Sequence, residues 1–226
     1  MRNVLVIGKF STEAFGLHIA ETLAQMGYGV FRFTPGVNAP QGGGVLRHRI
    51  NQARRVIWQA FDSIPKFRSK HIEGLWKLVK NQPIDYVIVC HDFLQPAEVA
   101  KLKQLTNAKI ALWFPDALVN FHKGYFMNAC YDGLFFKDPF IKFTFMEVLS
   151  SPVYYLPEAF NPTLHGLPEG TIIEDQYLCD LTTAGNAHSW RVAFYQLIAN
   201  YEVKVWGPPA PVWMPKDNLA KMWIKN

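Results

Sequence analysis

The sequence predicts an α/β fold in which a Rossmann-like, doubly wound parallel sheet is followed by the first βαβ unit of a second Rossmann-like domain. Short apolar runs of strand length alternate with segments whose apolar residues recur at helical spacing. This alternation continues from residue 3 to residue 156, as parallel sheets require. A stretch rich in Pro, Gly and polar residues at 161–174 then separates it from a second alternation.

The first βαβ unit is predicted at the amino terminus. Asn3–Ile7 is a short β-branched, apolar run, and apolar residues at helical spacing predict a helix over 13–26. Ser11 or Thr12 is a candidate N-cap for this helix. A second strand is expected at 30–33, so that the three elements read as strand, helix and parallel strand.

The rest of the first domain follows the same rules. Gly and Pro dominate residues 35–44, which predicts a loop, and helices are expected over 45–61 and 71–79 with a break at Pro65. Further strands are predicted over 84–90, 109–114, 134–136 and 153–156, and further helices over 96–105 and 139–149. In the second domain we expect a strand over 177–183, a helix over 189–199 and a strand over 203–206.

The positive charge is concentrated in one segment. Residues 45–80 carry nine Lys or Arg against two acidic residues, while the whole chain has 23 basic and 18 acidic residues. A protein coated with positive charge for nucleic acid is therefore excluded. The basic segment is a solvated helix face, or it makes peripheral contact with a membrane or an anionic acceptor.

Cysteine spacing and hydropathy indicate a cytoplasmic protein. Cys90, Cys130 and Cys179 lie far apart without the spacing of a zinc site or a disulfide framework. The amino-terminal apolar run is too short for a signal peptide, and no apolar stretch approaches the roughly 20 residues of a membrane span.

Polar residues that directly follow the predicted strands are the candidate site of the first domain, because ligands of open α/β sheets bind at the carboxyl ends of strands. These residues are Gly8, Lys9, His91, Asp92, Pro115, Asp116 and Glu158. His91 beside Asp92 offers a general base for a hydroxyl. Adjacent residues of an extended chain point in opposite directions, so at most one of the pair faces the cleft, and a capping Asp remains the alternative.

The loop after the first strand excludes several ligand classes. GKFSTEAFG lacks the GxGxxG spacing of nicotinamide and flavin sites, and it is no P-loop. Nor does it supply the acidic cluster of a receiver domain or the phosphate loop of a flavodoxin. Lys9, Ser11 and the backbone N–H groups could instead hold a polar acceptor. The sequence also lacks a DxD cluster, so no metal cofactor is expected.

A second candidate site lies in the second domain. Gly185 and Asn186 follow a predicted strand, and Arg191 lies about one turn into the next helix. Glycine permits close backbone approach, a helix amino terminus attracts anions, and Arg binds phosphate in a bidentate manner. An ordinary surface Arg at a helix start is the alternative interpretation.

The order of motifs resembles the CgeB-type, spore-maturation-protein glycosyltransferases of the GT-B fold. The resemblance covers residues 80–208 and is carried by IALWFPDA at 110–117, YDGLFFKD at 131–138, VYYLPEAFNP at 153–162, CDLTTAGNAHSWR at 179–191 and VKVWGP at 203–208. It implies an acceptor-side domain over 1–160, a linker over 161–174 and a donor-side domain over 175–226.

The resemblance also implies a function. Such enzymes move a sugar from a nucleotide-activated donor to a hydroxyl acceptor, commonly for surface polysaccharide or protein glycosylation. Gly185, Asn186 and Arg191 would approach the donor phosphates, while Asp116 and Glu158 would border the interdomain cleft. The implied mechanism is metal-independent, and the resemblance leaves the base open; His91 or Asp92 is the candidate.

The chain departs from this family because the motif that cradles the donor nucleotide and sugar is expected after Trp223 and is absent. We therefore expect either a fragment of a longer protein or a shortened homologue that docks a partner without catalysis. Weak or no binding of nucleotide sugars to this chain alone is expected. An incomplete second domain also predicts an oligomer formed through the aromatic tail, with Trp206, Trp213, Met222 and Trp223.

Overall fold

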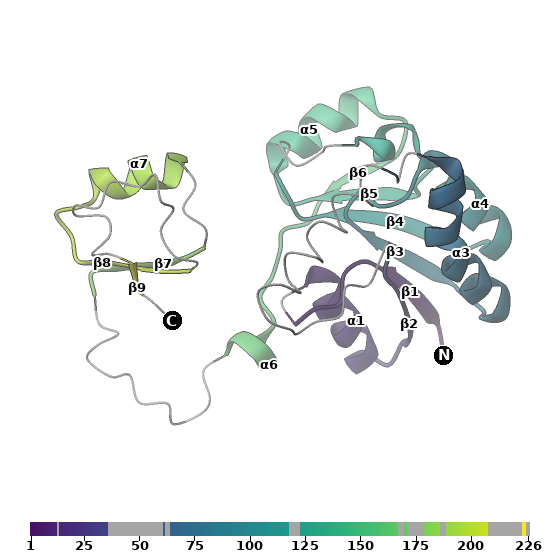
Figure 1. Ribbon diagram of the computed structural model, residues 1–226, viewed down its shortest axis with the longest axis horizontal. Coiled ribbons are helices and arrows are strands. Elements are labelled where there is room, and N and C mark those ends of the chain that lie inside the picture. Colours follow the sequence, from purple (N-terminus) through teal and green to yellow (C-terminus); the bar gives the residue numbers. More distant parts are fainter. Residues whose placement is uncertain are drawn as a thin grey trace. The chain divides into compact units, whose positions relative to one another are not determined.

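The computed structural model describes residues 1–12, 14–35, 61, 64–117, 123–166, 170, 179–185, 189–207 and 223–224. The chain divides into two compact units, Met1–Leu164 and His165–Asn226, and each is described by itself (Figure 1). The division falls within the stretch 161–174 that the sequence predicts as a linker.

A parallel sheet of six strands forms the centre of the first unit, in the order β2-β1-β3-β4-β5-β6. The strands are β1 (Asn3–Ile7), β2 (Gly29–Phe33), β3 (Tyr86–Cys90), β4 (Lys109–Phe114), β5 (Gly133–Phe136) and β6 (Val153–Tyr155). Val4 of β1 is in register with Val30 on one side and with Tyr86 on the other. The strand order therefore reverses at β1, which makes the carboxyl ends of β1 and β3 a topological switch point, where ligands of such sheets bind.

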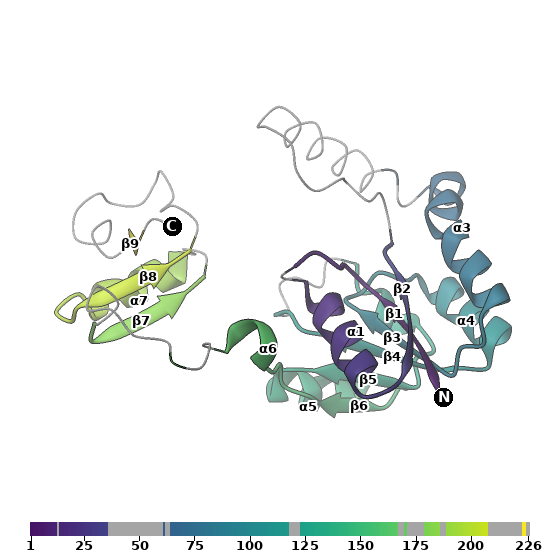
Figure 2. The same cartoon turned by 90° about the horizontal axis from the view of Figure 1, so that it is seen from below.

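The described helices of this unit are α1 (Phe15–Gln25), α3 (Pro65–Asn81), α4 (Pro96–Thr106), the short 3₁₀ helix η2 (Tyr125–Asn128) and α5 (Pro139–Val148), and α6 (Pro162–His165) spans the division between the two units. Figures 1 and 2 show α1 on one side of the sheet and the pair α3 and α4 on the other. Successive residues of a strand point to opposite faces. Accordingly Leu5 and Ile7 pack in the cluster that contains residues of α3, α4 and α5, whereas Val4 and Val6 pack with α1.

The sheet face on the α1 side carries an apolar pocket beside the helix. Its cavity volume is about 640 Å³, and its lining includes Ile88, Trp113, Phe135 and Tyr154 from β3 to β6. The rings of Phe135 and Tyr154 stack with their centroids 5.1 Å apart. The candidate residues Lys9, His91, Asp116 and Glu158 do not line this pocket.

Most predicted elements are confirmed, and two local predictions are wrong. Phe61 is helical and Ile64 is extended, so the helical path is interrupted just before Pro65, as predicted. The next helix, however, begins at Pro65 and not at residue 71, because the missing N–H of proline costs nothing in the first turn of a helix. Neither Ser11 nor Thr12 caps α1, because the N-cap is Ala14 and no side chain bonds there. The predicted loop beyond Pro35 and the predicted helix before Phe61 lie outside the described residues.

The second unit contains a separate parallel sheet in the order β7-β8-β9. Its elements are β7 (Leu181–Ala184), α7 (Ser189–Leu197), β8 (Val203–Trp206) and β9 (Trp223–Ile224), so the predicted βαβ unit is present. Val192, Tyr195, Val203 and Val205 are buried, whereas Trp190, Phe194, Leu197 and Tyr201 are exposed. Among the helices that the structure describes, none is both long enough and apolar enough to cross a membrane.

Candidate functional site

Charged side chains follow the strands of the first unit along the carboxyl edge of its sheet. Lys9 follows β1, His91 follows β3, Asp116 follows β4 and Glu158 follows β6. The imidazole Nδ1 of His91 lies 3.4 Å from the carboxylate Oδ2 of Asp116. Both side chains are partly exposed, so a ligand from solvent could reach them. The topology thus brings together two residues that are 25 positions apart in sequence.

His91 has an unusual backbone conformation. Its φ is 72°, in the left-handed region that residues other than glycine rarely occupy. The backbone N–H of His91 donates to the carbonyl of Trp113 at 3.2 Å. Its ring contacts the rings of Phe93 and Phe114 edge to face, with centroids 5.7 and 5.6 Å away. Such strained conformations concentrate at functional sites, where the surrounding structure holds them.

Burial lowers the pKa of His91, and this effect outweighs the nearby charges. The carboxylates of Asp116 and Glu158 raise the pKa, while the ammonium of Lys9 lowers it. Because the ordinary pKa of histidine is about 6.5, a lowered value leaves the imidazole neutral at pH 7. A neutral imidazole can accept a proton, as a general base must.

Asp92 points to a different part of the fold. Its Oδ2 accepts the backbone N–H of Tyr125 at 2.7 Å, and its Oδ1 accepts that of Phe126 at 3.0 Å. Burial raises the pKa of the Asp92 carboxyl, and these two hydrogen bonds act in the opposite direction. Asp92 therefore anchors the start of η2, which is the capping role that the sequence left open as an alternative.

Lys137 is a charged residue of this edge that sequence reasoning missed. It directly follows β5, and its Nζ lies 3.1 Å from the Oε2 of Glu158. The rule that selected the other candidates, a polar residue just past a strand, would also have selected Lys137. Within the described ranges, no group of three or more His, Cys, Asp or Glu side chains is placed to hold a metal ion.

The turn between β1 and α1 is built by close packing. A Cβ on Gly8 would lie 3.1 Å from the Cβ of Cys90, and one on Gly16 would lie 2.7 Å from the carbonyl oxygen of Lys9. Glycine at these positions lets the helix approach the strand end. The side chains of Lys9 and Ser11 are exposed beside it, and the carbonyl of Ser11 accepts the N–H of Ala14 at 2.8 Å.

In the second unit, Gly185 and Arg191 lie against each other. Gly185 has φ 135°, and a Cβ at this position would overlap the guanidinium of Arg191. The N–H of Gly185 donates to the carbonyl of Trp206 at 2.8 Å, which fixes the turn after β7. The guanidinium carbon of Arg191 lies 5.2 Å from the centre of the Trp190 ring. Asn186, the third residue predicted for this site, lies outside the described residues.

Comparison with known proteins identifies the fold. No family model matches the chain, and no curated protein matches it. The solved structure of UGT89C1 from Arabidopsis thaliana, complexed with UDP-L-rhamnose, is similar with a TM-score of 0.50 and 12% identity over 98% of this chain and 68% of that chain. The structure of LpCGTa in complex with UDP has a TM-score of 0.47 and 11% identity over 96% of this chain and 71% of that chain. The fold of this chain is therefore α/β, with a Rossmann-like parallel sheet of the kind found in GT-B glycosyltransferases.

Proposed function

We propose that this chain is a glycosyltransferase of the GT-B type, related to the CgeB-type enzymes, that transfers a sugar from a nucleotide-activated donor to a hydroxyl acceptor. The observation that carries the proposal is the pairing of His91 with Asp116 at the carboxyl edge of the first sheet, beside the switch point. The donor class is supported by the similar fold of UGT89C1, which was solved with UDP-L-rhamnose.

On the acceptor side, His91 acts as the general base. The Asp116 carboxylate, 3.4 Å from Nδ1 of His91, favours the tautomer that carries the proton on Nδ1, which leaves the lone pair of Nε2 free to take a proton. The acceptor oxygen bonds to the anomeric carbon of the sugar while its proton moves to Nε2. The bond between the sugar and the nucleotide diphosphate breaks, and its electron pair leaves with the diphosphate.

On the donor side, Gly185, Asn186 and Arg191 hold the diphosphate. The absence of a side chain at Gly185 lets the Arg191 guanidinium lie against the backbone of the turn, where it can bind phosphate oxygens. Contact with Trp190 restricts where that guanidinium can move. We propose that this cation neutralises the leaving diphosphate, so that transfer proceeds without a metal ion.

Binding and transfer by the same variants test the proposal. Saturation-transfer NMR with UDP, GDP and dTDP sugars is expected to show weak binding, with a Kd of about 1 mM or higher. Arg191→Gln should abolish this binding, Gly185→Ala should weaken it, and the surface substitution Arg32→Gln should leave it unchanged. His91→Gln should retain binding but lose transfer to a hydroxyl.

The pH dependence adds a second criterion. Transfer should fall as the pH falls through the pKa of His91, because protonation removes the base, and the midpoint should lie below about 6.5. The proposal is wrong if nucleotide sugars bind equally well to Arg191→Gln, or if His91→Gln transfers sugar at the original rate.

A second candidate function is a docking module without catalysis, and the exposed residues of the second unit favour it. Trp190, Phe194 and Leu197 recur on α7 at spacings of four and three residues, and Leu197 is 81% exposed. Exposed apolar side chains in such a row are typical of interaction surfaces. Light scattering of the full chain should then show an oligomer that Phe194→Asp dissociates, and a clean monomer at high concentration would contradict this candidate.

A further inference from the structure

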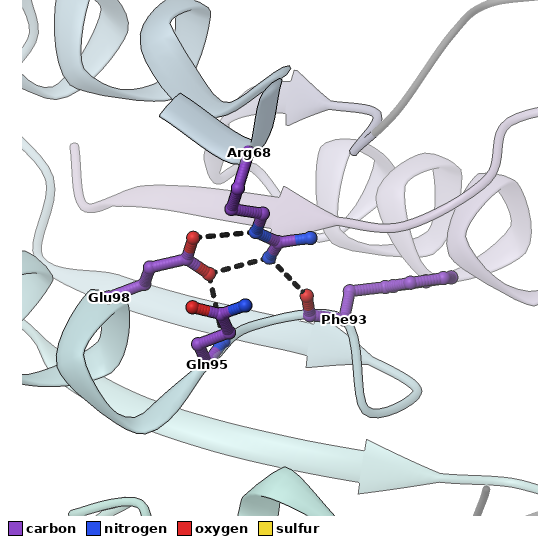
Figure 3. A network of polar contacts seen from close by, with 4 residues as sticks. All are labelled: Arg68, Phe93, Gln95 and Glu98. Carbon is purple, nitrogen blue, oxygen red and sulfur yellow. Dashed lines mark hydrogen bonds and ion pairs between the residues drawn. The ribbon is translucent and has the colours of Figure 1, made fainter. Parts of the chain in front are cut away.

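A buried ion pair joins two helices beneath the loop that carries His91. Arg68 belongs to the first turn of α3, and Glu98 to the first turn of α4. The Nε of Arg68 donates to Oε1 of Glu98 at 2.7 Å, and its Nη2 donates to Oε2 at 2.5 Å (Figure 3). Both residues are only 7% exposed. The geometry is the bidentate pairing that gives strong charge-assisted bonds.

The same two side chains also hold the main chain of the loop between β3 and α4. Nη2 of Arg68 donates to the carbonyl of Phe93 at 2.6 Å, and Oε2 of Glu98 accepts the N–H of Gln95 at 2.8 Å (Figure 3). The Gln95 side chain in turn accepts the backbone N–H of Glu98, which completes a capping box. Arg68 and Glu98 therefore hold the backbone of this loop at two positions, the carbonyl of Phe93 and the N–H of Gln95.

These bonds reach His91 through one further link. The N–H of Phe93 donates to the carbonyl of His91 at 2.9 Å, and His91 itself has φ 72°. A strained backbone of this kind persists only where its surroundings impose it. Arg68 holds the carbonyl of Phe93, and the N–H of Phe93 holds the carbonyl of His91. The position of the His91 backbone therefore depends on the position of Phe93, which Arg68 sets.

Stability alone does not explain an ion pair at this place. Replacing a buried ion pair with apolar residues of similar volume is often neutral or stabilising, because desolvation offsets the attraction between the charges. Apolar residues could fill the space between α3 and α4, but they could not bond the carbonyl of Phe93 or the N–H of Gln95. The bonds to the loop are the part of the arrangement that requires these two residue types.

We propose that Arg68 and Glu98 are positioning residues, which hold the loop of residues 91–95 so that His91 faces Asp116. This role rests on the proposed function, in which His91 is the base. Lys9, Asp116 and Glu158 are the charged groups that shift the pKa of His91, so Arg68 and Glu98 act on His91 through the backbone of the loop.

Titration of His91 by NMR tests the proposal without any substrate. The full chain, labelled at its seven histidines, gives one ring signal that His91→Gln removes, which assigns His91. Arg68→Met should release the loop and hydrate the imidazole, so that its pKa rises toward about 6.5. Arg68→Lys keeps the charge but cannot make three fixed bonds, and should shift the pKa in the same direction by a smaller amount.

Two further variants control for stability. Lys77→Met breaks an exposed ion pair with Glu73 on the same helix and should leave the His91 titration unchanged. The double variant Arg68→Leu with Glu98→Leu keeps the core filled but lacks the loop bonds, so it should fold and still shift the His91 pKa. An unshifted titration in the folded double variant would overturn the proposal.

If the variants of Arg68 and Glu98 all unfold, hydrogen exchange of the Phe93 amide in the unaltered chain tests the proposal instead. The Phe93 amide hydrogen should be protected from exchange if its bond to the His91 carbonyl is held, and exchange at the rate of an open loop would contradict the positioning role of Arg68 and Glu98. The outcome is separable from that of the proposed function. Should His91→Gln retain sugar transfer, His91 is not the base, yet the titration still tells whether Arg68 and Glu98 position it.

Discussion

At the scale of single residues, Asp92 is explained by its hydrogen bonds to η2. Asp92→Ala leaves the N–H groups of Tyr125 and Phe126 without their acceptor, and we expect a loss of about 1–3 kcal/mol in the free energy of unfolding. Asp92→Asn should cost less, because one amide oxygen still accepts. Urea denaturation measures both changes.

Asp138→Ala serves as the control for this prediction, since it removes an exposed cap that accepts a single N–H, from Phe140 at 2.8 Å. Its cost should be smaller, about 0.5–2 kcal/mol. If Asp92→Ala left stability unchanged but abolished sugar transfer, Asp92 rather than His91 would become the candidate base.

Position after a strand was sufficient to select most candidate residues from the sequence, because the carboxyl ends of parallel strands meet at one edge. What the sequence could not show is which candidates pair. Asp92 bonds backbone groups more than 30 positions away, and His91 turns toward Asp116 through a left-handed backbone angle. Both depend on tertiary contacts that local pattern does not encode.

At the scale of elements, the strands were predictable because an apolar run that ends at polar or Gly residues has few alternatives. β1 and β4 have the predicted bounds. Helix starts were harder. α3 begins at Pro65, six residues before the predicted start at 71, because proline is compatible with the first turn of a helix and Arg68 is buried against the rest of the unit.

The start of α4 is connected to the loop that carries His91, because Glu98 both completes the capping box and pairs with Arg68. Its capping box places Glu98 three residues after Gln95, a spacing that is visible in the sequence. The partner of Glu98 is Arg68, 30 positions earlier, and no local pattern indicates that pairing. Arg68 lies within the basic segment that charge counting treated as a solvated face, which explains why a buried arginine was missed there.

At the scale of the whole molecule, the first unit has an extensive core of its own. In the part of the chain that the structure describes, the residues of two hydrophobic clusters lie before Leu164, and helices pack on both faces of the sheet of the first unit. In the second unit, the buried apolar residues that the structure describes are Val192, Tyr195, Val203 and Val205. Stability rises with buried apolar area, so the first unit should fold without the second.

A shortened chain of residues 1–164 tests this expectation. It should unfold in one cooperative transition and give the same His91 titration as the full chain, because Asp116, Lys9 and Glu158 are all retained. A chain that ends at Val148 is the matched control, since it loses β6 with buried Val153 and leaves β5 unpaired at its edge, and it should be clearly less stable. Circular dichroism and histidine NMR measure both chains. If the 1–164 chain is unfolded or aggregates, the second unit is required for the core of the first, and the proposed acceptor site cannot be treated as belonging to one unit.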